Sequence, residues 1–402
     1  MAQRPIIGLV LVIACFCSAC TARRSFPAPN LPPFTELVPA DPKPEHPVIR
    51  QASQLSEPIM PKPPRSVLAV SGGGLYGAYA AGVLKGWTAS GTRPQFDVVT
   101  GISTGALIAT AAFLGPDYDN VIENLYTTVE TRDVFRRHWL PAMFWSESLA
   151  DSKPLRQLIE SAITPGALDE IAEAHRAGRR LYVGTTNLDT TRLVVWDMGA
   201  IAAGNEPNKL ELFRSLLLAS CSIPGLMPPV PIDIEIDGKR HTELHVDGGV
   251  SAMMFVQPYM LRDAAGRVPA KTDVYVLISG KLEADGPPVR RRFMSVTLES
   301  INGVFRARHR ADLDRIAQIA RQAGANFGYA AMAEDTPTAT TAMSFDPKLM
   351  RQLFDAGYEF AHSGPKWDRR PPGLDPEDSA LPRSGVRFNT IESLPPPAAI
   401  KP

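Results

Sequence analysis

Two short apolar runs near the start of the central part of the chain are each followed by a glycine-rich turn. The run at 66–71 leads into Gly72–Gly77, and the run at 96–100 leads into Gly101–Gly105. Short apolar runs bounded by glycines are typical of buried strands. A segment rich in small residues and patterned like a helix follows each turn. The repeated order of strand, turn and helix predicts parallel βαβ units.

Segments with the spacing of strands and of helices continue along the chain to residue 364. Strands that alternate with helices predict an α/β fold. We expect a three-layer sandwich with a mostly parallel central sheet and extra helices towards the C-terminus. Further strands are expected at 181–187, 193–197, 241–247 and 273–279, a Pro-rich loop at 223–231, and helices at 153–177, 209–220, 304–323 and 347–362.

The 38 prolines of the 402-residue chain gather on either side of this central part. Twelve lie in 27–64 and nine in 365–402. Proline-rich segments favour extended polyproline conformations. We therefore expect a spacer over residues 20–65 and a disordered tail over residues 365–402.

The first residues have the pattern of a secretory signal peptide. Arg4 precedes an apolar run over 6–17 that is too short to span a bilayer, and small residues follow it. The segment then reaches Cys20, and its end resembles the lipobox of bacterial lipoproteins, with Cys20 as the lipidated residue. This resemblance implies a signal peptide over 1–19 and a lipid anchor in the bacterial cell envelope. If the host has two membranes, it implies the outer membrane, facing the periplasm.

Two other interpretations of this segment stay open. The signal peptide could be cut nearby without lipidation, or Cys17 and Cys20 could begin a metal site, although no second cysteine pair follows. With Cys20 lipidated, only Cys221 remains in the mature chain, so no intramolecular disulfide is expected. No later apolar run approaches the length of a membrane-spanning helix, so none is expected there.

The charges argue against a nucleic-acid partner. Lys and Arg together number 42, as do Asp and Glu, whereas a nucleic-acid binder usually has a basic excess. The run Arg290–Arg292 is expected to be a solvated turn, with contact to anionic headgroups as the alternative. One expected strand carries four possible metal ligands on one face: His241, Glu243, His245 and Asp247. Zinc-binding histidine pairs four residues apart suit a helix rather than a strand, so we expect no metal there. We expect no cofactor either.

Gly101-Ile102-Ser103-Thr104-Gly105 has the pattern of a nucleophile elbow, a serine on a tight turn between a strand and a helix. The flanking glycines allow the unusual backbone and the close helix packing that such a turn requires. The N-terminus of the following helix also favours developing negative charge. Ser103 is therefore the expected nucleophile, and a plain strand-to-helix turn is the alternative.

The first glycine turn has two interpretations. Gly72, Gly74 and Gly77 have the spacing of a dinucleotide fingerprint after a strand, and Asp97 lies 20 residues beyond Gly77. The run Gly72-Gly73-Gly74 also presents several backbone N–H groups together, as an oxyanion hole requires. A serine elbow one βα unit later favours the oxyanion interpretation.

Asp247 ends an expected strand and is followed by Gly248 and Gly249, so its carboxylate can approach another loop closely. Taken alone, an Asp-Gly step most often forms a simple turn. His309 and His362 follow Asp247 in the order expected for the catalytic histidine of an α/β-hydrolase. Each lies among charged residues of an expected helix, so we expect both at the surface.

Together these motifs resemble the patatin-like phospholipase family. Gly72–Gly77 is similar to its oxyanion motif, Gly101–Gly105 to its nucleophile elbow, and Asp247–Gly249 to its Asp-Gly-Gly motif. Tyr76 stands where the family usually has Arg or Lys. Two weaker blocks agree with the resemblance, Asp151–Leu155 and Ala219–Gly225.

The resemblance implies a patatin-like catalytic domain over 66–258, with residues 259–364 completing the α/β fold with added helices. It implies an enzyme that hydrolyses acyl esters of a phospholipid, lysophospholipid or neutral lipid, without metal. In the implied mechanism Ser103 forms an acyl-enzyme and Asp247 is its base partner, with no histidine between them. The amides of Gly72–Gly74 then form the oxyanion hole.

Two alternatives belong to other classes of function. A nucleotide-binding module using Gly72–Gly77 would show a nucleotide-induced rise in melting temperature and no esterase activity. A non-catalytic envelope lipoprotein that retains the fold would place Ser103 away from Asp247.

Overall fold

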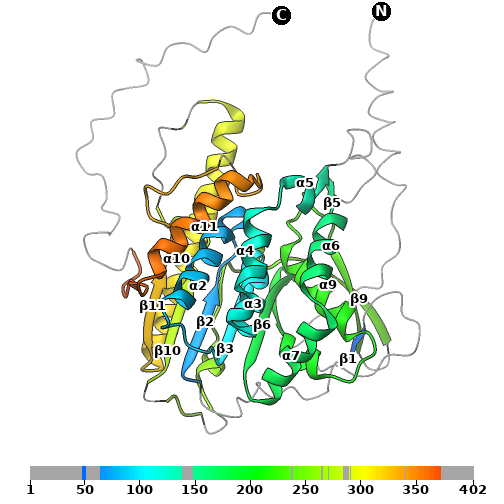
Figure 1. The fold of residues 1–402 in the computed structure, drawn as a ribbon. Helices are drawn as coiled ribbons and strands as arrows, with labels where there is room; N and C mark the ends of the chain where they lie inside the picture. Colours follow the sequence, from blue (N-terminus) through cyan, green and yellow to red (C-terminus); the bar gives the residue numbers. More distant parts are fainter. Residues whose placement is uncertain are drawn as a thin grey trace, which may run out of the picture.

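The computed structural model describes residues 48–50, 64–137, 148–236, 239–263, 266–269, 271–283, 289, 291–339 and 341–372 (Figure 1). The predicted signal peptide, the predicted lipidation site Cys20, most of the predicted spacer and residues 373–402 lie outside the described residues. Among the described helices, none is both long enough and apolar enough to cross a membrane.

The described strands form one nine-stranded sheet and one two-stranded sheet. The larger sheet has the order β1-β8-β9-β6-β3-β2-β10-β11, and β7 also pairs with β6. Its pairings are parallel except those of β7 and β9 with β6 and of β8 with β9. The strands are β1 (Val48–Arg50), β2 (Ser66–Val70), β3 (Val98–Ile102), β4 (Arg136–Arg137), β5 (Ala150–Asp151), β6 (Arg180–Asn187), β7 (Arg192–Asp197), β8 (Val230–Ile236), β9 (Lys239–Asp247), β10 (Asp273–Leu277) and β11 (Asn326–Ala330).

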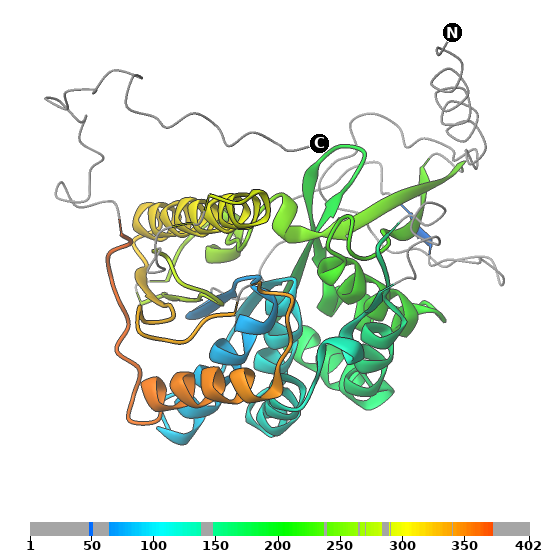
Figure 2. The same ribbon diagram turned by 90° about the horizontal axis from the view of Figure 1, so that it is seen from above.

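Helices cover both faces of the larger sheet, which gives three layers. Viewed from above, α2, α3 and α11 lie on one face and the long helix α10 lies on the other (Figure 2). The helices are α2 (Gly77–Ala89), α3 (Thr104–Leu114), α4 (Asp119–Thr127), α5 (Thr131–Val134), α6 (Lys153–Ala162), α7 (Pro165–Arg176), α8 (Met198–Ala203), α9 (Lys209–Cys221), α10 (Phe293–Gln322) and α11 (Pro347–Ala361).

Strand β2 is buried on both faces, and its side chains alternate between two apolar clusters. Leu68 and Val70 join the cluster under α2 and α3, whereas Val67 and Ala69 join the cluster under α10. Successive strand side chains point to opposite faces, so a strand covered by helices on both faces reads as a continuous apolar run. The predicted three-layer α/β fold with a mostly parallel sheet is confirmed.

The helix expected over 153–177 is interrupted. Helix α6 ends at Ala162 and α7 begins at Pro165. Proline at the first helical position lacks the N–H that an uninterrupted helix would need, and it disfavours a helical conformation for the residue before it. That residue, Thr164, instead caps α7 by accepting a hydrogen bond from the Ala167 N–H at 3.2 Å.

The structure also moves two predicted boundaries. Within the predicted spacer, β1 pairs in parallel with the edge strand β8, because its residues Val48 and Ile49 suit a strand and that edge is available. Within the predicted tail, Trp367 packs its ring 4.8 Å from that of Trp87, and the Asp368 and Tyr329 backbones exchange hydrogen bonds. Burial of a large aromatic ring therefore extends the folded body past residue 364.

Candidate active site

Ser103 lies on the turn between β3 and α3, with φ 55° and ψ −131°. A positive φ is rare for a residue other than glycine, and such strain costs about 1–3 kcal/mol unless neighbours fix it. Here the Ser103 N–H donates to Ser220 Oγ at 2.9 Å, and Ser220 Oγ donates to the Gly184 carbonyl at 2.8 Å. All three residues are buried, so α9, which carries Ser220, ties the elbow to β6.

The glycines on either side of Ser103 let α3 begin directly against the sheet. A Cβ atom on Gly105 would lie 2.4 Å from the Val70 carbonyl oxygen, and one on Gly101 would lie 2.3 Å from the Gly105 carbonyl oxygen. Neither position can hold a larger residue unless α3 shifts. A shift of α3 would also move Ser103, which immediately precedes it.

Asp247 ends β9 and meets Ser103 directly. Ser103 Oγ donates a hydrogen bond to Asp247 Oδ2 at 2.6 Å, and the Gly249 N–H donates to Asp247 Oδ1 at 2.7 Å. The Asp247 N–H donates to the Ser222 carbonyl at 2.8 Å. The C-terminal end of α9 and the turn after it therefore hold both partners, through Ser220 on one side and Ser222 on the other.

Burial sets the acidity of the Asp247 carboxyl group. Desolvation raises its pKa from 3.8 to about 6, and the hydrogen bonds from Ser103 and Gly249 oppose that rise. A carboxylate with a pKa near 6 is largely ionised at neutral pH, and it is a stronger base than an exposed one. It can therefore accept a proton from the hydroxyl that it contacts.

The glycine loop, residues Gly72–Gly77, runs beside Ser103 and Asp247. A Cβ atom on Gly72 would lie 3.2 Å from the Ser103 Cβ, which places the loop against the serine. The Gly72 N–H donates to the Met253 carbonyl at 2.9 Å, so the prediction that all three glycine amides form the oxyanion hole is wrong for Gly72. No described residue accepts a hydrogen bond from the Gly73 or Gly74 N–H, so these two amides remain available for a ligand.

Gly73 leaves no space for a side chain. A Cβ atom there would lie 2.0 Å from the Ser279 carbonyl oxygen, just beyond β10. Any larger residue at position 73 would therefore displace the loop, and with it the amides of Gly73 and Gly74.

His309 is buried against the glycine loop, so its predicted place at the surface is wrong. Its Nε2 lies 3.1 Å from the Gly72 carbonyl oxygen, and its Nδ1 lies 3.0 Å from the Phe305 carbonyl oxygen. Carbonyl oxygens only accept hydrogen bonds. Burial lowers the pKa of His309, so the neutral ring has one proton and can donate to one of the two carbonyls. A bond to the Gly72 carbonyl fixes the peptide group whose N–H belongs to Gly73.

Asp312, one turn beyond His309 on α10, holds the loop that follows Asp247. Its Oδ2 accepts a hydrogen bond from the Met253 N–H at 2.7 Å, and the Met253 carbonyl accepts one from Gly72. With the His309 proton on Nε2 and donated to the Gly72 carbonyl, helix α10, the glycine loop and the Met253 loop form a closed ring of hydrogen bonds. This ring links the glycine amides to the segment that carries Asp247.

The other residues considered as ligands are engaged elsewhere. His245 Nε2 lies 2.9 Å from Glu243, and its Nδ1 lies 2.9 Å from Thr185 Oγ1. Asp97, which the dinucleotide interpretation needs at a ribose, accepts hydrogen bonds from the backbone N–H groups of residues 65 and 66. Tyr76 shares hydrogen bonds with the backbone of Ala339, so it lies against the C-terminal part of the chain.

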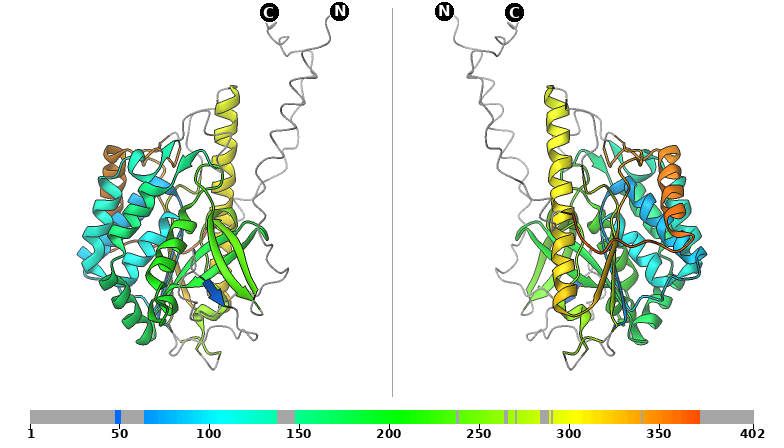
Figure 3. Two further views of the ribbon diagram at one scale, coloured as in Figure 1. Left: turned by 90° about the vertical axis from the view of Figure 1, so that its right-hand side faces the viewer. Right: turned by 90° about the vertical axis from the view of Figure 1, so that its left-hand side faces the viewer.

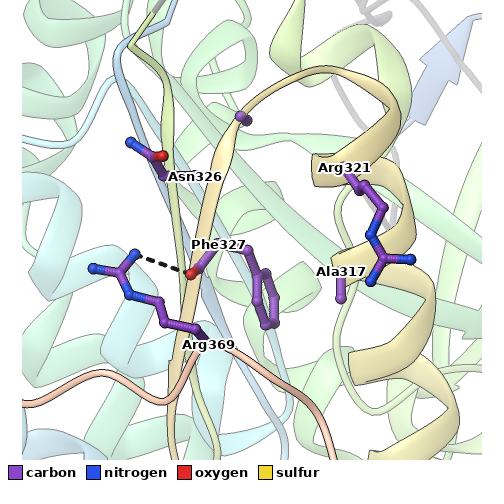
Figure 4. Close-up of a pocket in the computed structure, with 6 residues that line it drawn as sticks. Ala317, Arg321, Asn326, Phe327 and Arg369 are labelled. Carbon is purple, nitrogen blue, oxygen red and sulfur yellow. Dashed lines mark hydrogen bonds between the residues drawn. The ribbon is translucent and has the colours of Figure 1, made fainter. Parts of the chain in front are cut away.

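A cavity of about 530 Å³ opens between α10 and β11, away from the motif residues (Figure 4). Within it, the Arg369 guanidinium donates to the Phe327 carbonyl at 3.0 Å. The cavity lies beside Ala317, eight residues past His309, or about 12 Å along the helix. Its lining residues are Ala317, Arg321, Ala325, Asn326, Phe327 and Arg369.

Sequence reasoning missed several residues that hold the site. Ser220 lies in the block Ala219–Gly225. That block resembles the family, but the resemblance alone did not indicate what Ser220 does. His309 and Asp312 lie in an ordinary amphipathic stretch, and nothing local distinguishes them from surface residues. Their partners, Gly72 and Met253, are 237 and 59 residues away in the chain.

Solved structures with distant similarity to this chain include VipD and ExoU. VipD from Legionella pneumophila is 13% identical, over 81% of this chain and 68% of VipD, with a TM-score of 0.33. The type III effector protein ExoU is 14% identical, over 75% of this chain and 54% of ExoU, with a TM-score of 0.26. No curated protein matches the sequence. The model of the family described as patatin-like phospholipase matches residues 68–259, which contain all three motifs. Over this segment, which is just under half of the chain, the protein carries a patatin-like phospholipase domain.

Proposed function

We propose that this protein is a serine hydrolase of lipid acyl esters, of the phospholipase A or lysophospholipase type, acting through a Ser103–Asp247 dyad. The family implies a lipid hydrolase. The observation that carries the finer proposal is the direct 2.6 Å hydrogen bond from Ser103 Oγ to Asp247 Oδ2. It joins a serine at a strand-to-helix elbow to a buried carboxylate whose pKa is raised to about 6.

In the first half of the reaction, Ser103 Oγ attacks the ester carbonyl carbon while its proton passes to Asp247 Oδ2. The negative charge that forms on the carbonyl oxygen is held by the N–H groups of Gly73 and Gly74. The tetrahedral species then breaks its bond to the alcohol part of the lipid. The departing oxygen takes the proton from Asp247, which leaves an acyl group on Ser103.

In the second half, a water molecule attacks the acyl carbonyl and gives one proton to Asp247. Collapse of the second tetrahedral species releases a fatty acid. Ser103 recovers its proton from Asp247, so both residues return to their starting state. Each proton moves between Asp247 and an oxygen that is breaking or forming a bond, so the steps need no histidine.

We further propose that the enzyme works at a membrane of the bacterial cell envelope, anchored by lipid on Cys20. The apolar run over 6–17, which ends in small residues before Cys20, supports this location. A spacer between Cys20 and the folded body would let the active site reach the surface of the same membrane.

Covalent labelling tests the proposed nucleophile. A fluorophosphonate probe should label the wild-type protein at Ser103, and Ser103→Ala should remain unlabelled and inactive on lipid esters. Ser222→Ala is a matched control, because Ser222 is buried near Asp247 but its hydroxyl donates to the Leu218 carbonyl. It should keep labelling and activity. An adduct that peptide mapping places on Ser71 or Ser222 would refute the assignment.

A further inference from the structure

About the first three and a half turns of α10 carry apolar side chains that no described part of the chain covers. Phe293 is 81% exposed and Val304 is 67% exposed, and Val296, Ile301 and Phe305 are each more than 40% exposed. Single exposed apolar residues are common, whereas a cluster of them on one element marks an interaction surface. We call residues 293–305 the α10 arm.

The apolar residues of the α10 arm share one side of the helix. At about 100° per residue, the five exposed apolar residues fall within about 180° of one another, so they occupy one half of the helix surface. Glu299 and Arg306 fall on the opposite side, where they form an ion pair. The arm is therefore amphipathic although no described element packs on its apolar side, the pattern of a helix that lies in a membrane interface.

The α10 arm stands at the end of the molecule that holds Ser103. The later part of α10 packs on the sheet through Leu313, Ile316 and Ala320, whereas the earlier part projects beyond the other layers (Figure 3). His309, at the base of the arm, contacts the glycine loop beside Ser103. Phe293 lies 16 residues before His309, or about 24 Å along the helix.

Positive charge flanks the apolar residues at both ends. Arg291 and Arg292 precede the arm, and Arg306, Arg308 and Arg310 follow its last apolar residue. Arg306 pairs with Glu299 and Arg308 with Asp312, so the charge before the arm is the less compensated of the two. Arginines beside an apolar helix face complement anionic lipid headgroups. They disfavour a second copy of this chain as the occupant, because two such segments would repel each other.

We propose that the α10 arm docks on an anionic phospholipid surface, with its apolar side among the acyl chains and its flanking arginines at the headgroups. Docking there places the Ser103 site at the surface that holds its substrate. The inference rests on the proposed lipid hydrolysis, but it concerns binding and can be measured separately.

The test uses the full chain carrying Cys20→Ala throughout, so that a lipid anchor cannot contribute to binding. Sedimentation with vesicles of phosphatidylglycerol and phosphatidylcholine should show binding that weakens with salt. Phe293→Ser with Val304→Ser should weaken it at least about tenfold, from the burial of two apolar side chains. Val121→Ser is the matched control, because Val121 is 40% exposed on α4, in the layer opposite α10.

Two further measurements test the contribution of the arginines to vesicle binding and separate vesicle binding from catalysis. Arg291→Gln with Arg292→Gln should weaken binding to anionic vesicles by about fivefold per arginine and hardly change binding to pure phosphatidylcholine. The Phe293/Val304 variant should keep the wild-type kcat/KM on a soluble short-chain ester and lose activity on vesicles, because neither residue belongs to the catalytic machinery.

Equal vesicle binding by the Phe293/Val304 variant and the Val121 control would overturn the inference. So would self-association of the wild-type chain that the same variant abolishes, since the arm would then bind a second copy. A wild-type chain that binds vesicles as expected but hydrolyses neither the soluble ester nor the lipid would contradict the proposed function, and the docking surface would stand.

Discussion

The environment of Asp247 predicts a variant that is inactive and yet more stable than the wild type. In Asp247→Asn, the side-chain oxygen can still accept from the Gly249 N–H, and the side-chain NH₂ can donate to Ser103 Oγ. The contacts and the shape are kept, but the group can no longer accept a proton. Turnover should therefore fall about as fully as in Ser103→Ala, and the double variant should be little worse than either single one.

The expected gain in stability follows from the pKa of the buried carboxyl group. Burial raises it from 3.8 to about 6, which corresponds to about 3 kcal/mol. The folded protein holds this proton more tightly than the unfolded chain does. The stabilising effect of the proton is therefore fully present below about pH 3.8 and is lost as the pH rises through about 6. Asparagine does not titrate, so Asp247→Asn should be more stable by up to ~3 kcal/mol at neutral pH, with little difference near pH 4.

Urea unfolding followed by circular dichroism between about pH 4 and pH 8 measures this difference. Asp117→Asn is the control, because Asp117 is an exposed aspartate outside the site. In parallel, wild-type kcat/KM should rise with pH to a plateau with a midpoint near 6, the pKa of the base. An Asp247→Asn protein that is less stable than wild type at neutral pH, or a gain that does not grow with pH, would refute the reasoning.

Three other changes have defined outcomes. His309→Gln should lower kcat about tenfold or more with little change in KM, because it loosens the peptide group of the Gly73 amide. The control His362→Gln, at an exposed histidine, should leave both kcat and KM unchanged. A rise in KM as large as the fall in kcat would instead indicate a defect in substrate binding. Gly105→Ala should lower the melting temperature sharply because its Cβ would meet the Val70 carbonyl, and Gly166→Ala, where the nearest atom is 3.8 Å away, should not. Cys20→Ala should abolish lipidation, and mass spectrometry that finds an unmodified mature N-terminus at another residue in the wild type would contradict the predicted anchor.

The sequence indicates those parts of the site whose required residues lie within a few positions of one another. The elbow at Ser103 and the Asp-Gly-Gly turn at Asp247 each need glycines within a few residues, so each leaves a pattern in the chain. The parallel strands are equally visible, because a strand buried on both faces, such as β2, reads as a continuous apolar run.

What the sequence does not reveal depends on contacts between distant segments. Whether the Gly72 N–H is free depends on Met253, and whether His309 is buried depends on how α10 crosses the glycine loop. Likewise, β1 forms only because β8 offers an edge, and residues 365–372 join the body through Trp367. The hydrophobic pattern near these residues does not indicate which distant residues or strands they will contact.

The position of β10 limits how this protein can be shortened. β10 pairs with β2 over five residue pairs, Asp273–Leu277 with Ser66–Val70, and it lies beyond the segment that matches the family model. A fragment that stops at residue 259 would leave β2 with a bare edge of N–H and C=O groups, next to the glycine loop. Such an edge recruits strands from other chains. Proteolytic loss of the last third of the protein should therefore yield aggregates rather than a smaller enzyme, and a separately supplied C-terminal fragment should restore solubility by donating β10.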